Sequence, residues 1–143
     1  MKLTVRPVEL SFVHQALNNG ANKFIALGVL ANQSTHELYS YANAVQYLTL
    51  GQWELFVAVD ENNVIQGAAT ITYANYPKER VAFITALGGK GVVNIDVFGQ
   101  LQYYLSKFRG VTLIQAWCSG ALERLYRRVN LKAANIKLVE IKL

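Results

Sequence analysis

Cysteine, histidine and proline are scarce in this chain, and the first two shortages exclude classes of protein. The single cysteine, Cys118, cannot form a disulfide within the chain, and two histidines without a spaced set of further ligands argue against a metal site. No apolar run approaches the roughly 20 residues that cross a bilayer. The opening residues MKLTVRPVEL contain no hydrophobic segment typical of a secretion signal. We therefore expect a cytoplasmic protein with no metal ion and no membrane partner.

The composition is that of one folded domain. Hydrophobic residues make up 52% and charged residues 16% of the 143 positions, a balance that excludes disorder and allows a substantial core. No repeat or linker divides the chain, so we expect a single domain over residues 1–143. The formal net charge of +5 is compatible with nucleic acid, an anionic cofactor or an acidic partner, and it selects none of them.

Much of the positive charge lies late in the chain, among regularly spaced apolar residues. That combination is typical of the solvent-facing side of a helix, and no aromatic platform for nucleic-acid bases accompanies it. The sequence therefore disfavours nucleic acid as a partner. The basic residues concerned are Lys107, Arg109, Arg124, Arg127, Arg128 and Lys132.

The first third of the chain predicts one strand and two helices. Residues 3–6 suit a short strand, and apolar residues recur at helical spacing over residues 9–18, where an Asn-Asn-Gly sequence ends the pattern. Ser34 and Glu37 form a capping box, in which each side chain bonds the backbone amide of the other residue. This pattern predicts a second helix that starts at Ser34 and is closed by Gly51.

The middle of the chain predicts three strands. Residues 53–59 and 64–73 are rich in β-branched and aromatic side chains, and the short polar connection between them is typical of an antiparallel hairpin. A third apolar stretch, residues 80–87, runs into the glycine-rich stretch Gly88–Gly91. A strand, a glycine-rich turn and a helix in this order commonly hold a phosphate, because helix N-terminal amides attract the anion and glycine allows close approach. A tight connection without a ligand is the alternative.

The last third predicts two helices and two strands. Apolar residues three and four apart indicate helices over residues 94–109 and 120–130, separated by an apolar strand at 111–118. Alternation in NIKLVEIKL, residues 135–143, predicts a final edge strand. Because a right-handed crossover joins parallel strands, strands 81–87 and 111–118 should be parallel neighbours. The helix residues that we expect to be buried against the sheet are Phe98, Leu101, Leu105, Phe108, Leu122, Leu125 and Val129.

The order of these elements and the segment LERLYRRVN resemble the GNAT acetyltransferase family. Members usually carry the motif LYxxxGF on the last helix, and Leu125, Tyr126, Asn130 and Leu131 occupy that frame here. Asn130 retains some tolerance of a positive φ angle, and Leu131 retains an apolar anchor. The resemblance implies an α/β (α+β) fold with a single mixed, mostly antiparallel sheet, whose central parallel strand pair is flanked by helices. In the family these two strands splay apart and admit the pantetheine arm of the cofactor.

The resemblance also implies a cofactor site and an acid. In the family, a turn of pattern Q/R-x-x-G-x-G/A holds the pyrophosphate of coenzyme A; aligned on Gly91, this chain has Gly88 at the basic position and Val93 at the last small position. Tyr126 would lie near the sulfur as the acid, although it also belongs to the apolar stripe of its helix. The residues implied to bind the cofactor are Ala86, Leu87, Gly88, Gly89, Lys90, Gly91 and Ser119.

No convincing general base accompanies Tyr126, because the strand 80–87 carries no carboxylate and the sequence does not show which way Glu54 faces. Two functions therefore remain open. The first is an N-acetyltransferase that moves an acetyl group from acetyl-CoA to a small-molecule or protein amine. The second is a catalytically degenerate relative, similar to small GNAT-like proteins of tailed bacteriophages. Such a protein would have lost acetyl-CoA and would bind a protein partner in virion assembly or on the host, in the host cytoplasm or the virion.

Overall fold

The computed structural model describes residues 2–33, 38–118, 120–134 and 136–143. At its centre lies a five-stranded sheet with the strand order β1-β2-β3-β4-β5. Neighbours among the first four strands pair antiparallel, whereas β5 pairs parallel to β4, which confirms the expected mixed sheet. The strands are β1 (Thr4–Val8), β2 (Glu54–Val59), β3 (Ile65–Asn75), β4 (Arg80–Gly89) and β5 (Leu113–Ala116).

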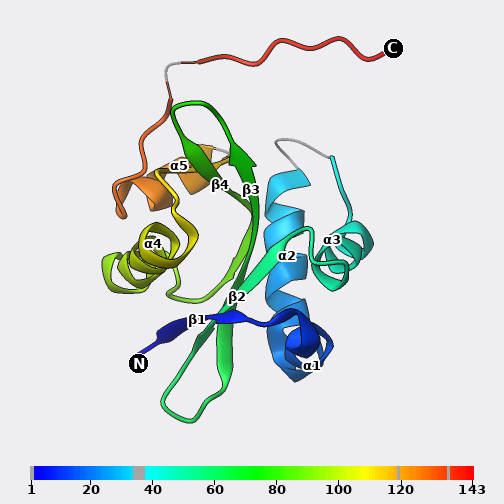
Figure 1. The fold of residues 1–143 in the computed structure, drawn as a ribbon, viewed down its shortest axis with the longest axis vertical. Helices are drawn as coiled ribbons and strands as arrows, with labels where there is room; N and C mark the ends of the chain where they lie inside the picture. Colours follow the sequence, from blue (N-terminus) through cyan, green and yellow to red (C-terminus); the bar gives the residue numbers. More distant parts are fainter. Residues whose placement is uncertain (1, 34–37, 119, 135) are drawn as a thin grey trace.

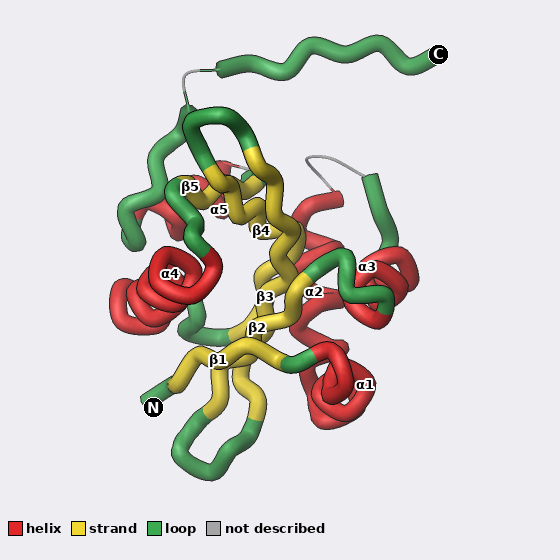
Figure 2. Tube along the Cα trace, viewed as in Figure 1, coloured by secondary structure: helices red, strands yellow, loops and turns green. Residues whose placement is uncertain are grey.

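Helices cover both faces of the sheet, as Figures 1 and 2 show. One face carries α1 (Val13–Ala16), α2 (Asn22–Gln33) and α3 (Tyr41–Thr49), with a 3-10 turn at Leu10–Phe12 and a π turn at Leu17–Ala21. The other face carries α4 (Ile95–Arg109) and α5 (Gly120–Arg127). Each helical layer therefore has its own hydrophobic core against the sheet. Within the described ranges, no helix has the length and apolar character needed to span a bilayer.

The helix α2 has no counterpart in the sequence prediction, which ended the first helix at the Asn-Asn-Gly sequence. Gly20 has a φ of 118°, which glycine adopts without the steric cost that a side chain would add, and the chain kinks there rather than leaving the helical path. The buried residues Ala21, Ile25 and Val29 follow at a spacing of four. This stripe continues helical spacing past the glycine and could have predicted α2.

The helix α3 begins at Tyr41, so the predicted continuous helix from Ser34 is wrong, since residues 38–40 are not helical. The capping box at Ser34 and Glu37 itself lies outside the described residues. Ser40 makes the cap instead: its hydroxyl accepts a hydrogen bond from the Asn43 amide (3.2 Å), and Asn43 Oδ1 accepts from the Ser40 amide (2.9 Å). Asparagine thus plays the part that the sequence prediction gave to glutamate.

The crossover from β4 through α4 to β5 is confirmed. Val81 pairs with Leu113 in parallel, and the helix between the strands packs on the sheet. Of the residues expected to be buried, Phe98, Leu101, Leu105 and Val129 are at most 4% exposed, Leu125 is half-buried, and the side chain of Leu122 lies outside the described set. The prediction for Phe108 is wrong, because it lies one residue before the end of α4, contacts the ring of Tyr104 at 4.8 Å between ring centres and remains 56% exposed.

The predicted final strand is also wrong. Residues 136–143 have no regular structure, and their side chains are exposed. A strand needs a neighbouring strand to satisfy its backbone, and none pairs with this segment in the described parts of the chain. The helix before it ends at Arg127, and Asn130 has a φ of 70°, as its place in the motif led us to expect.

The outer edge of β1 is closed by a side chain of α4. The Val5 amide donates a hydrogen bond to Gln100 Oε1 (2.8 Å), and Gln100 Nε2 donates to the Leu3 carbonyl (2.9 Å). Gln100 thus replaces the backbone of a further strand. Pro7 lies in the same strand and has no amide to offer. Together the glutamine and the proline protect this edge from pairing with another strand.

Candidate functional site

The parallel strands β4 and β5 separate toward their carboxyl ends. Their pairing ends at Ile84 and Ala116. Beyond that level β4 continues to Gly89, whereas the chain leaves β5 and enters α5 at Gly120. Within the described residues, no strand pairs with the β5-facing edge of β4 over residues 85–89. In α/β sheets a ligand commonly binds beside the carboxyl ends of strands that separate in this way, so we take this opening as the candidate site.

A bulge in β4 lies where the opening begins. The register between β3 and β4 shifts at Thr70/Ile71, which leaves Thr85 without a residue opposite it. The Thr85 hydroxyl donates to the Thr70 carbonyl (3.0 Å). The Thr85 carbonyl accepts hydrogen bonds from Asn32 Nδ2 (2.9 Å) and from Tyr39 Oη. The end of α2 and the segment before α3 thus hold the bulge in place, and we call Asn32, Tyr39 and Thr85 the bulge latch.

Sequence reasoning missed the bulge latch, because no spacing motif joins its residues. Burial raises the pKa of Tyr39, and its hydrogen bond with Asn32 acts in the opposite direction. The ring of Tyr39 packs edge-on against Trp53, with the ring centres 5.0 Å apart. The phenol is therefore held as a protonated donor at neutral pH, fixed by packing as well as by its hydrogen bond.

Tyr126, the acid implied by the family resemblance, comes from α5. Its side chain is 7% exposed and packs in the core beneath α4. Burial raises the pKa of Tyr126 to about 12, with further contributions from Cys118 and Tyr39. A phenol with this pKa is protonated at neutral pH and can act only as a proton donor there.

The thiol of Cys118 lies near the same point of the fold. Burial raises the pKa of Cys118, and the Glu123 carboxylate raises it further. Because the thiolate is the reactive form, a raised pKa makes this cysteine a poor nucleophile at neutral pH. The predicted site residue Ser119 follows it and lies outside the described residues.

Gly88 on β4 and Gly28 on α2 allow the helix to pack closely on the strand. The predicted turn began at Gly88, but β4 extends through Gly88 and Gly89, which pair with β3. A Cβ added to Gly88 would lie 2.1 Å from the carbonyl oxygen of Phe24 on α2. From the opposite side, a Cβ on Gly28 of α2 would lie 2.6 Å from the Leu87 amide nitrogen. The backbones of α2 and β4 therefore touch, and only glycine permits the contact.

The turn from β4 to α4 covers residues 90–94. Gly91 has a φ of 76°, and an added Cβ would meet nothing within 4 Å. Asn94 fixes the turn from within, since its Oδ1 accepts from the Val97 amide (2.9 Å) and its Nδ2 donates to the Gly91 carbonyl. Lys90 is exposed beside Gly91. Of the predicted cofactor-binding residues, Lys90 and Gly91 thus have backbone or side chain facing open space.

Two neighbours weaken the case for an anion at this turn. Val93, at the position where the family pattern has a small residue, is half-buried and packs into the core beneath α4. Asp96 adds a negative charge in the first turn of α4. Of the remaining predicted residues, Ala86 is buried on the face of β4 beneath α2, and Leu87 packs on the opposite face, so both could offer a ligand only their backbone.

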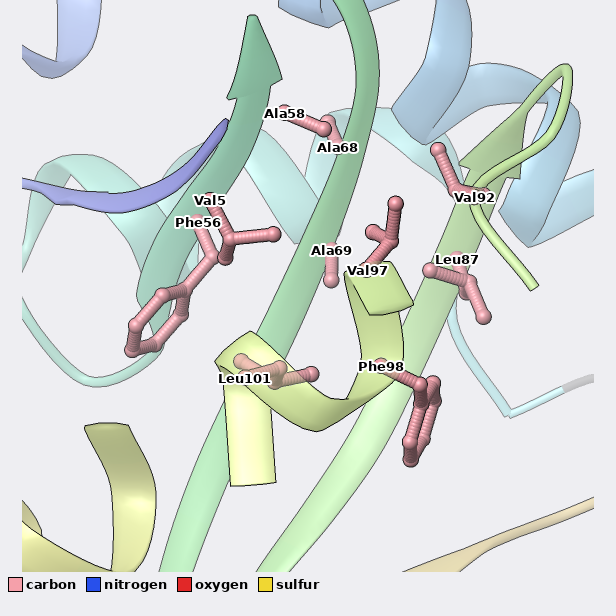
Figure 3. Close-up of a pocket in the computed structure, with 10 residues that line it drawn as sticks. All are labelled: Val5, Phe56, Ala58, Ala68, Ala69, Leu87, Val92, Val97, Phe98 and Leu101. Atoms are coloured by element: carbon pink, nitrogen blue, oxygen red, sulfur yellow. The ribbon is translucent and has the colours of Figure 1, made fainter. Parts of the chain in front are cut away.

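A small cavity lies behind the turn, between the sheet and the start of α4 (Figure 3). Its volume is about 30 Å³, and its walls are apolar. It is therefore a packing defect of the core and too small for a pantetheine arm. The residues that line it are Val5, Phe56, Ala58, Ala68, Ala69, Leu87, Val92, Val97, Phe98 and Leu101.

Glu54, whose direction the sequence left open, is held in an ion pair. Arg109 donates to both carboxylate oxygens, from Nε to Oε1 (2.9 Å) and from Nη2 to Oε2 (2.6 Å). Tyr73 Oη also donates to Oε1 (2.5 Å), and burial together with the Glu54 carboxylate raises the pKa of Tyr73. Since its oxygens are already engaged by three donor groups from two side chains, Glu54 is not available as a general base. In the part of the chain that the structure describes, no three potential metal ligands cluster.

Neither a protein-family model nor a curated protein matches the sequence. Solved structures do match. A "possible acetyltransferase" from Clostridium difficile 630 superposes with a TM-score of 0.68 at 12% identity, covering 100% of this chain and 99% of that one. A "predicted acetyltransferase with acetyl-CoA" from Clostridium acetobutylicum gives 0.61 at 15% identity, covering 99% and 96%. An aminoglycoside acetyltransferase from an uncultured soil metagenomic sample, solved with sisomicin, gives 0.64 at 11% identity, covering 99% and 95%. The chain therefore has the fold of GNAT acetyltransferases.

Proposed function

We propose that this chain is an N-acetyltransferase that transfers the acetyl group of acetyl-CoA to an amine. The observation that carries the proposal is the separation of β4 from β5 beyond Ile84, where the chain leaves β5 for α5, the helix that carries the protonated phenol of Tyr126. An unpaired strand edge offers alternating backbone donors and acceptors, which suit an extended ligand with amide groups.

The groups around the opening fit acetyl-CoA. The edge of β4 over residues 85–89 would hold the amide-bearing arm, and the turn with Lys90 and Gly91 would hold the phosphates. Gly91 leaves space in front of its backbone, and Lys90 supplies a positive charge for them. When bound, acetyl-CoA supplies an activated acetyl thioester.

Only a few side chains of the protein would take part in the reaction. Tyr126 holds a proton at Oη at neutral pH and would give it to the leaving sulfur, and the proton that the acetylated nitrogen releases would return the phenol to its protonated form, so that protons balance. Asn32 and Tyr39 fix the Thr85 carbonyl and with it the path of β4, so that the strand edge keeps its position during the reaction. With Glu54 engaged by Arg109, we infer that the amine reacts in its neutral form without a dedicated carboxylate base.

For the acceptor we propose a small-molecule amine. The support is the fold shared with the aminoglycoside acetyltransferase, whose acceptor class is of this kind. A protein amine is the other acceptor class to be tested. Incubation with radiolabelled acetyl-CoA and a panel of amino sugars, polyamines and peptides with free N-termini distinguishes the two classes.

The deciding experiment is calorimetric titration of acetyl-CoA into the purified chain, followed by a transfer assay on Tyr126→Phe. We expect micromolar binding by both proteins and a loss in kcat of about a hundredfold or more for the variant, the usual contribution of a positioned acid. Tyr103→Phe is the matched control, since Tyr103 is 60% exposed on the outer side of α4. If millimolar acetyl-CoA produces no measurable heat of binding, the proposal is refuted.

One observation favours a second function, a non-enzymatic protein-binding role on the same fold. Glu54 is bound by Arg109, and Val93 stands where the family pattern has a small residue. The chain therefore has few groups that could take part in catalysis. Such a chain would bind a protein partner, for instance in virion assembly or host binding, and would neither bind acetyl-CoA nor be protected by it against thermal unfolding. The titration above therefore also tests this alternative.

A further inference from the structure

Two aromatic rings lie together where β4 and β5 begin to separate. The rings of Phe83 and Trp117 meet edge to face, with their centres 5.8 Å apart and their planes at 65°. Phe83 comes directly before Ile84, and Trp117 directly after Ala116, which are the two residues at which the pairing of β4 with β5 ends. The ring pair therefore lies at the start of the opening.

The ring pair lies on the face of the sheet opposite Tyr126. Side chains alternate between the faces along a strand, and Ile84 and Ala116 pack with Tyr126 in the core beneath α4. Phe83 therefore points to the face that carries α2, and Trp117, whose ring it contacts, shares that face (Figure 2). The opening thus has a phenol on one face of the sheet and two rings on the other.

The surface around the ring pair is uncharged and partly open. Phe83 pairs with Thr72 on β3 and with Gln115 on β5, so these two side chains share its face. All three are half-buried, and Trp117 is 37% exposed. The closest approach of α2 to β4 lies further along the strand, at Gly88. Aromatic side chains with a few neutral polar neighbours are the usual lining of a site for a small molecule.

We propose that Phe83 and Trp117 form the acceptor subsite, and that the acceptor is a primary amine carried on an aromatic ring. This inference rests on the proposed acetyltransferase function and narrows its acceptor class. The ring of the acceptor packs against Trp117, and a short alkyl chain carries its nitrogen past the last paired residues into the opening. Thr72 and Gln115 offer a hydroxyl and an amide to polar substituents of that ring.

The position of the subsite suits the transfer step. The amine nitrogen bonds to the acetyl carbon from the face of the ring pair, and the carbon–sulfur bond breaks. The sulfur takes the proton of Tyr126 from the α4 face, and the nitrogen gives up one proton, which restores the phenol. Since the four side chains of the subsite carry no charge, they offer no carboxylate to a polycationic acceptor. Aromatic rings do attract cations, so a polyamine is the competing occupant.

The first test measures binding by fluorine NMR on the chain labelled with fluorotryptophan. The chain has two tryptophans, and Trp117→Phe identifies their resonances. With coenzyme A present, phenethylamine should shift the Trp117 resonance at a concentration about fivefold lower than cyclohexylethylamine, which has a non-aromatic ring of similar size. Trp53, which packs on Tyr39 and Tyr47, is the internal control and should not shift. An unmoved Trp117 resonance, or one shifted equally well by spermidine, overturns the proposal.

The second test compares acetyl transfer to phenethylamine with transfer to propylamine, which has no ring. The ratio of the two kcat/KM values should fall about fivefold in Trp117→Leu and should be largely kept in Trp117→Phe. Tyr103→Leu is the matched control, since Tyr103 is exposed on the outer side of α4, and should leave the ratio unchanged.

The outcomes separate this inference from the proposed function. A chain that binds acetyl-CoA and acetylates amines, but whose ratio is the same in Trp117→Leu as in the parent, refutes the aromatic acceptor alone. A chain that binds no acetyl-CoA in the calorimetric titration refutes both. A shift of the Trp117 resonance by phenethylamine without any transfer to it shows a ring-binding surface that is not an acceptor subsite, and this also overturns the inference.

Discussion

Residues 85–89 of β4 and the turn 90–94 that follows them are adjacent in sequence and opposite in environment. In the strand segment, the backbone at Gly88 touches α2, and the Thr85 carbonyl is bound by two side chains. In the turn, Gly91 faces open space. One glycine-rich stretch therefore serves two purposes. Its first part lets a helix approach the face of the sheet, and its last glycine leaves open space in front of the turn.

The largest effect should come from Gly88→Ala. The new methyl group would lie 2.1 Å from the Phe24 carbonyl oxygen, so helix and strand must move apart, at a cost of about 3 kcal/mol in the free energy of unfolding. Urea denaturation measures this cost. Gly28→Ala, which forces the same two backbones apart from the helix side, should behave alike. An unchanged denaturation midpoint in both variants would mean that the contact between α2 and β4 is not required.

Alkaline pH should produce the next largest effect. The pKa of Tyr126 is raised from 10.0 to about 12 in the folded chain, so its contribution to stability is complete below pH 10 and is lost as the pH rises through 12. The loss should amount to about 2–3 kcal/mol, and the raised pKa values of Tyr39 and Tyr73 add to it. Denaturation midpoints at increasing pH measure it. Tyr126→Phe should show a shallower decline than the parent, and identical slopes would contradict the assignment.

Tyr39→Phe should have a smaller effect. The Thr85 carbonyl keeps the hydrogen bond from Asn32 when the phenol is removed, so we expect a loss of about 1 kcal/mol in the free energy of unfolding. Asn32→Ala/Tyr39→Phe removes both donors and should cost more than the sum of the single variants, because the buried carbonyl is then left without a partner. Strict additivity in this double-mutant cycle would show that the bulge latch does not act as a unit.

The smallest effect on stability should come from Gly91→Ala. Nothing lies within 4 Å of the added methyl group, and only the φ of 76° opposes it, so the cost should be about 1 kcal/mol, the lower end of the penalty for a side chain in the left-handed region. If the turn holds phosphate, acetyl-CoA binding should weaken far more than stability does. Calorimetry on this variant separates the effect on acetyl-CoA binding from the effect on stability. Gly99→Ala in α4 is the matched control, because a methyl group added there also meets nothing within 4 Å. Equal loss of binding in both variants would contradict a ligand role for Gly91.

The sequence predicted the central architecture because its signals there are local and mutually consistent. The hairpin of β2 and β3, the crossover through α4 and the parallel pairing of β4 with β5 all follow from apolar periodicity and chain direction. Phe98, Leu101 and Leu105 are buried as their spacing predicts.

The errors have physical causes that no local pattern contains. Gly20 kinks the chain without ending the helical path, so its sequence looks like a helix end. Gly88 and Gly89 look like a turn, but both belong to β4, and Gly88 is required by the close approach of α2, an element that was not predicted. Thr85, Asn32 and Tyr39 meet only because β4 bulges, and such a meeting depends on tertiary register. Phe108 follows the stripe of α4 by spacing, yet at the helix end it stacks on Tyr104 in solvent.

The hydrogen bonds between Gln100 and β1 have a consequence for polymerisation. A sheet grows into a fibre when every added molecule both consumes one edge and presents another. Here one end of each sheet is blocked by a side chain that belongs to the same molecule, and Pro7 beside it lacks a donor. A unit with a single reactive end acts as a chain terminator: once two such ends have met, nothing remains from which growth could continue.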